Sequence, residues 1–154
     1  MENKIHANDL KKQILLHGLD ENDYEALTTL IEYKSFDKGD VLFEQGEPSK
    51  GIYLIKTGRV RIQKSFSGGR YKTIVIFQDN NFFGDLSVLE KRPHSAAAVA
   101  LTPTEIYLLK DFNFDCTKGE NTLLMCKILK RLALISSKNL RQMNEKFLRL
   151  GQSF

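Results

Sequence analysis

Between Phe36 and Phe77 the sequence alternates short runs of β-branched and aromatic residues with glycines, and this pattern restricts the fold more than any other feature. Turns at such short intervals between strand-like runs are typical of an antiparallel barrel or sandwich. The last pair of glycines lies between two such runs and predicts the tip of a hairpin. The glycines concerned are Gly39, Gly46, Gly51, Gly58, Gly68 and Gly69.

Helical patterns flank this strand-rich region on both sides. Residues 7–34 carry apolar residues at helix spacing, with a break at Gly18. From about residue 120 to 150 the apolar residues again step by three and four, and the phase changes at 136–139. The phase change predicts either a bend or a stutter in one long helix.

Residues 82–100 combine features that favour an anion site. They read Phe-Phe-Gly-Asp-Leu-Ser-Val-Leu-Glu-Lys-Arg-Pro-His-Ser-Ala-Ala-Ala-Val-Ala, which predicts a strand exit, a glycine hinge, one helical turn at 86–89, a charged tip and a strand of small residues. The first N–H groups of a helix have no intrahelical partner and can face an anion. Asp85 can accept hydrogen bonds from hydroxyls, and the small residues 95–98 leave room for a ligand.

This stretch resembles the phosphate-binding cassette of the cyclic-nucleotide-binding domain, which occurs in catabolite activator proteins, kinase regulatory subunits and gated channels. The resemblance implies an α+β fold: an antiparallel β-roll, a jelly-roll-like barrel, flanked by N-terminal helices and a long C-terminal helix. It also implies cyclic AMP or cyclic GMP as ligand. We therefore expect one domain over 1–154, with N-terminal helices in 1–35, the β-roll in 36–110 and a helical segment in 111–154. The matching positions are Phe83, Gly84, Leu86, Ser87, Ser95, Ala96 and Val99.

Two positions depart from the family pattern. Asp85 replaces the glutamate that receives the ribose 2′-hydroxyl, and His94 replaces the arginine that pairs with the cyclic phosphate. Histidine is mostly neutral at pH 7 and lacks the two-pronged fork of arginine. Losing a charge-assisted contact of about 1.5–3 kcal/mol weakens binding about 10- to 150-fold, unless the phosphate recharges the histidine. Arg92 is a candidate substitute cation.

The C-terminal helix is longer than a small barrel can cover, so its second half requires a partner. In bacterial members of the family such a helix pairs with its twin and closes over the base of the ligand. The resemblance therefore implies a homodimer through this helix, and it matches Ser136 to a hydroxyl residue that touches the purine. Ile135 stands where the family has a threonine. The alternative is that Ser136 faces solvent or backbone.

Composition is that of an ordinary globular chain, with 42% hydrophobic and 27% charged residues. The apolar runs are too short to cross a bilayer and no secretion signal is visible, so we expect a cytoplasmic protein without a membrane segment.

Cys116 and Cys126 suggest free buried thiols rather than a disulfide or a zinc site. Residues 111–154 carry eight basic and four acidic side chains, which we interpret as a solvated helix face.

Three hypotheses about function follow. The first is a homodimeric, non-catalytic sensor that binds a cyclic nucleotide at Gly84, Asp85, His94 and Ser95 and signals to an unknown protein partner through helix movement. The second is a dimeric interaction module that keeps the fold without the nucleotide. The third, a cupin-like metalloenzyme, is disfavoured because the histidines are scattered and no nucleophile motif is present. The given sequence has no helix-turn-helix after the long helix, so we expect no DNA-binding domain.

Overall fold

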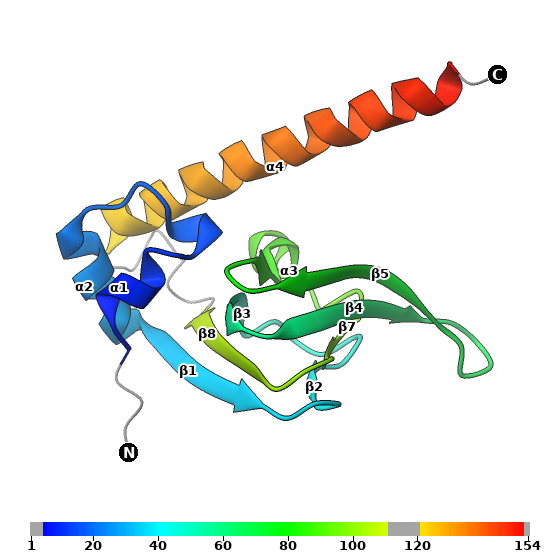
Figure 1. Cartoon of the computed structure of the whole chain (residues 1–154), viewed down its shortest axis with the longest axis horizontal. Helices are drawn as coiled ribbons and strands as arrows, with labels where there is room; N and C mark the ends of the chain where they lie inside the picture. The colour runs from blue at the N-terminus through cyan, green and yellow to red at the C-terminus, as the bar shows by residue number, and fades with distance from the viewer. Residues whose placement is uncertain (1–4, 111–120, 153–154) are drawn as a thin grey trace.

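The computed structural model describes residues 5–110 and 121–152, which form a two-sheet β-roll with helices on one side (Figure 1). The strands are β1 (Ile31–Phe36), β2 (Val41–Phe43), β3 (Gly51–Thr57), β4 (Arg59–Ser65), β5 (Tyr71–Gln78), β6 (Phe82–Phe83), β7 (Ala97–Ala100) and β8 (Thr104–Lys110). The helices are α1 (Ala7–Leu10), η1 (Ile14–Leu16), α2 (Glu21–Leu30), α3 (Asp85–Glu90) and α4 (Thr122–Gly151). The predicted fold class is confirmed.

The strands pair antiparallel in two four-stranded sheets, in the orders β1-β8-β3-β6 and β2-β7-β4-β5. The predicted hairpin is present, because β4 and β5 pair along their length and Gly68 and Gly69 at its tip both have positive φ. Asn80 also has a positive φ of 69°, which asparagine tolerates better than other non-glycine residues.

The middle parts of the central strands β3 and β8 are buried on both faces, and each is a run of four apolar residues, 52–55 in β3 and 106–109 in β8. Ile52 and Leu54 of β3 pack with the helices, whereas Tyr53 and Ile55 point between the two sheets. The same alternation holds in β8. The roll and the helices are therefore held together by one sheet, and this fixes the position of α4 relative to the cassette region.

The N-terminal region differs from the prediction at its end. A capping box of Asp20 and Asp23 starts α2, but the helix ends at Leu30, and residues 31–34 belong to strand β1 instead of the expected helix. Ile31 continues the helical spacing of Leu27, yet it pairs with Leu109 in the sheet. The expectation of a helix over residues 7–34 is therefore wrong for 31–34, because cross-strand pairing outweighs local periodicity there.

α4 is one α-helix of 30 residues without interruption at 136–139. Its first half packs on the core through Met125, Ile128 and Leu132, and Lys127 forms ion pairs with Asp23 at 2.8 Å and Asp20 at 3.6 Å. Its second half diverges from the roll toward the C-terminus (Figure 1). Cys126 is exposed, so the predicted burial of this thiol is wrong; Cys116 lies outside the described residues.

Within the described residues, no helix is both long enough and apolar enough to cross a membrane.

Candidate functional site

The hinge before α3 forms as the sequence predicts. Gly84 has a φ of 85° and precedes the helix, which runs one residue further at each end than the predicted turn at 86–89. A Cβ atom at Gly84 would lie 3.1 Å from the carbonyl oxygen of Gly51 and 3.3 Å from Cδ2 of Tyr53. Glycine is therefore required here both by the left-handed backbone and by the close packing.

His94 lies inside the roll beneath α3 and is only 4% exposed. Its ring stacks on Phe43 with the centroids 3.6 Å apart, and Nδ1 lies 3.2 Å from Oγ of the buried Ser87. The other ring nitrogen, Nε2, is buried and has no hydrogen-bond partner among the residues that the structure describes. Burial lowers the pKa of His94, although the charge of Glu47 acts in the opposite direction. Burial thus favours the neutral form of the imidazole.

The backbone around His94 is fixed on both sides of the residue. Its N–H donates to the carbonyl of Glu47 at 3.0 Å, and its own carbonyl accepts from Gly46 at 2.8 Å. Arg92, the candidate substitute cation, is exposed and forms an ion pair with Glu90 at 2.6 Å. Arg92 therefore directs its charge at a neighbouring carboxylate rather than at the hinge.

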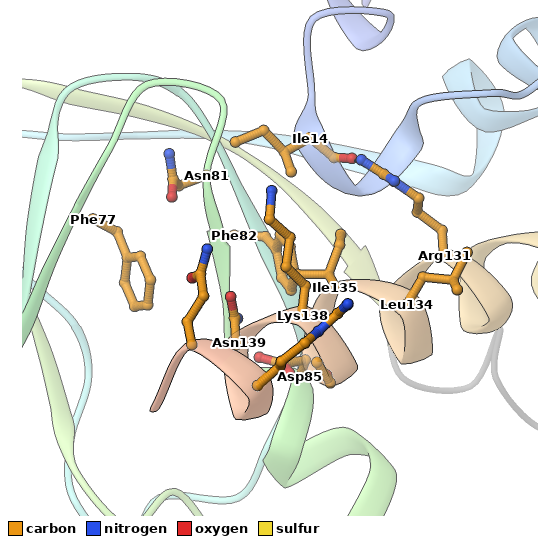
Figure 2. Close-up of a pocket in the computed structure, with 13 residues that line it drawn as sticks. Ile14, Phe77, Asn81, Phe82, Asp85, Arg131, Leu134, Ile135, Lys138 and Asn139 are labelled. Atoms are coloured by element: carbon orange, nitrogen blue, oxygen red, sulfur yellow. The ribbon is translucent and has the colours of Figure 1, made fainter. Parts of the chain in front are cut away.

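A cleft of about 560 Å³ separates α4 from the roll and brings Asp85 and Ser136 to one cavity. Figure 2 shows Asp85, Phe82, Phe77 and Asn81 on the side of the roll, and Arg131, Ile135, Lys138 and Asn139 along α4. Burial raises the pKa of Asp85, and hydrogen bonds from its own backbone N–H and that of Leu86 partly oppose this. A half-buried carboxylate facing a cavity is suited to accept hydrogen bonds from hydroxyls.

The predicted site residues do not form a single cluster. Asp85 and Ser136 line the cleft, whereas Ser87 and His94 contact each other inside the roll. Gly84 lies between the two, since a Cβ built on it would be 3.9 Å from Cε1 of His94. Leu86 and Ser95 are exposed, and Ala96 is buried.

Three cations on the cleft side of α4 were missed by the sequence interpretation. Arg131, Lys138 and Arg141 line the cavity, and Nε of Arg131 donates to the carbonyl of Ile14 at 3.1 Å. Their separation by seven and three residues places them on one helix face, and this was the available signal. From the sequence alone, the excess of basic side chains in residues 111–154 predicts only a solvated helix face.

No cluster of three or more His, Cys, Asp or Glu side chains suited to a metal ion occurs within residues 5–110 and 121–152.

The part of the sequence that matches a known family model covers the β-roll. The family model described as "Cyclic nucleotide-binding domain" matches residues 33–115. The cyclic AMP receptor protein of Thermus thermophilus is 29% identical over 100 residues, which is 65% of this chain and 46% of that protein. The cAMP-dependent protein kinase regulatory subunit of Candida albicans is 28% identical over 73% of this chain and 24% of its own length. The chain thus spans less than half the length of these curated relatives.

Solved structures share the fold over most of the chain. The catabolite activator protein of Thermus thermophilus superposes with a TM-score of 0.73 at 24% identity, covering 90% of this chain and 63% of that structure. A cyclic nucleotide-binding domain from Methylobacillus flagellatus gives a TM-score of 0.78 at 20% identity, covering 92% and 82%. At these identities the similarity describes the architecture alone.

Proposed function

The chain belongs to the cyclic nucleotide-binding domain family, and from that premise we propose that it is a non-catalytic regulatory sensor that binds cyclic AMP or cyclic GMP. The observation that carries the proposal is the cleft, which Asp85 of α3 and Ser136 of α4 line together. Asp85 would accept a ribose hydroxyl and Ser136 would contact the base. The cavity volume of about 560 Å³ lies in the range common for small-molecule sites.

Recognition of the cyclic phosphate depends on His94 in this proposal. Burial lowers the pKa of the ring in the free protein and so favours its neutral form, and within residues 5–110 and 121–152 Nε2 has no hydrogen-bond partner. A phosphate beside the ring favours the charged form, which makes both nitrogens donors. Nucleotide binding is then coupled to proton uptake, so its affinity falls as the pH rises.

A change in the position of α4 can transmit ligand binding to a partner protein. A nucleotide that contacts α3 and α4 at once stabilises one position of α4 relative to the roll, and this shifts the population of helix positions. The second half of α4 carries an apolar row at coiled-coil spacing, which suits pairing with the same helix of a second copy. We propose that this row is the homodimer interface; its members are Leu140, Met143, Phe147 and Leu150, each at least 60% exposed.

A second candidate function is a dimeric interaction module that binds no nucleotide. The enclosure of His94 against Phe43 favours it, because a phosphate would have to reach a ring that is only 4% exposed. The apolar row of α4 serves both candidates, so the nucleotide site is what distinguishes them.

Isothermal titration calorimetry with cyclic AMP and cyclic GMP at about pH 6 and pH 8 separates the two functions, because the unperturbed pKa of histidine lies between these values. The sensor predicts saturable binding that is tighter at the lower pH. His94→Arg supplies a permanent cation and should raise the affinity about tenfold or more while reducing the pH dependence. His17→Arg changes an exposed histidine outside the cleft and serves as the matched control. Absence of heat with both wild type and His94→Arg would contradict the sensor and support the interaction module.

A further inference from the structure

The positive charges of the cleft lie on α4 and not beside the cassette hinge. Arg131, Lys138 and Arg141 line the cavity, and Asp85 is the one acidic residue among the described residues of the lining. Within residues 5–110 and 121–152, neither Lys138 nor Arg141 forms an ion pair. Two unpaired cations at a concave site attract an anion more strongly than the same charges on an open surface.

Among the residues that the structure describes, the hinge side of the cleft lining holds no lysine or arginine. His94 is neutral inside the roll, and Arg92 is paired with Glu90. A nucleotide in the cleft therefore meets permanent positive charges that lie on α4 (Figure 2). Lysine and arginine are the side chains best suited to bind phosphate oxygens.

Dimerisation through α4 leaves these cations accessible. At about 100° of rotation per residue, Lys138 projects nearly opposite Leu140 and Phe147, and Arg141 also faces away from them. The apolar row and the cationic face of α4 are thus different surfaces, and both can be used at the same time.

We propose that Lys138 and Arg141 form a phosphate subsite on the α4 side of the cleft, so that this chain prefers a nucleotide carrying a second phosphate over a cyclic mononucleotide. The inference rests on the proposed function in that it uses the same cleft for a nucleotide. Two sources share this chemistry: a cyclic dinucleotide and a linear nucleoside polyphosphate.

Binding of three probes to the full chain tests the subsite: cyclic AMP, cyclic di-AMP and ATP without added metal. We expect at least one of the two larger probes to bind about tenfold or more tightly than cyclic AMP, and the preferred probe identifies the source. The double variant Lys138→Gln with Arg141→Gln should remove most of that preference, because losing a phosphate contact lowers the affinity for the preferred probe about tenfold or more, and cyclic AMP should lose less affinity than that probe.

The matched control is Lys130→Gln with Lys146→Gln, which removes the same charge from exposed positions of α4 outside the cleft. It should leave all three affinities within about twofold, because distant exposed charges are largely screened by salt. Equal affinity for all probes, or equal losses in both double variants, overturns the subsite. Binding of cyclic AMP alone overturns the subsite and leaves the proposed function intact. Binding of a larger probe alone, dependent on Lys138 and Arg141, supports the subsite and contradicts a cyclic mononucleotide sensor.

Discussion

His94 stacks face to face on Phe43, with ring centroids 3.6 Å apart and planes 8° from parallel. The ring is the last member of an aromatic group inside the roll in which Phe43 contacts Tyr53 and Phe83. A side chain at the position where the family places a phosphate-binding arginine is thus also part of the core. Its protonation therefore affects stability as well as ligand binding.

The free protein should lose stability as the pH falls through 6.5, the unperturbed pKa of histidine. Burial lowers the pKa of His94 in the folded state, so below 6.5 the unfolded chain takes up a proton that the folded chain resists. Denaturant midpoints measured above and below this value should show the loss, and His94→Gln should reduce the difference between them. An unchanged pH dependence in His94→Gln would show that other groups are responsible.

Gly84→Ala should destabilise the chain more than a substitution at a glycine of similar φ in open space. The new Cβ meets the carbonyl of Gly51 in addition to the strain of the left-handed backbone, so we expect a loss of about 2–5 kcal/mol in the free energy of unfolding. Gly68 has a φ of 83° with nothing within 4 Å of its Cβ position, and Gly68→Ala should lose only about 1–2 kcal/mol. Urea unfolding of both variants measures the difference. Equal losses would mean that the backbone conformation alone selects Gly84.

The positions of α3 and of the β4–β5 hairpin followed from the sequence because local chemistry determines them. Gly84 and the pair Gly68 and Gly69 adopt positive φ; Gly84 directly precedes α3, and the glycine pair lies in the turn between β4 and β5. The turn residues thus define both the hinge and the hairpin tip without reference to distant parts of the chain.

Features that depend on distant residues were not predictable in this way. Ile31 satisfies the spacing of α2 but pairs with Leu109, and only the sheet selects the strand. The stacking of His94 on Phe43 joins residues far apart in sequence. Comparison with the family motif therefore identified the position of His94 but did not predict that its ring is buried. The cationic face of α4 became a candidate site only when the roll supplied the opposite side of the cleft.

Asp85→Asn should stabilise the free protein near neutral pH and weaken nucleotide binding. Burial raises the pKa of Asp85 above 3.8 in the folded state, so stability is lost as the pH rises from 3.8 through the folded pKa and the carboxyl ionises. The amide removes this cost but is a weaker acceptor for a ribose hydroxyl. Thermal unfolding at pH 7 and calorimetry with cyclic AMP measure the two effects. Glu145→Gln, an exposed carboxylate of α4 outside the cleft, should change neither.

Two neighbouring residues of α4 test the proposed homodimer interface. Phe147 is 77% exposed and belongs to the apolar row, whereas Leu148 is 65% exposed and lies on a different face of the helix. Phe147→Glu places like charges across the two-fold axis and should weaken the dimer about tenfold or more, while Leu148→Glu should not. Sedimentation equilibrium over a range of protein concentrations measures the dissociation constants. Because neither side chain is buried in the single chain, both variants should retain the β-sheet signal in circular dichroism. Equal weakening by both substitutions would contradict a specific interface along this row.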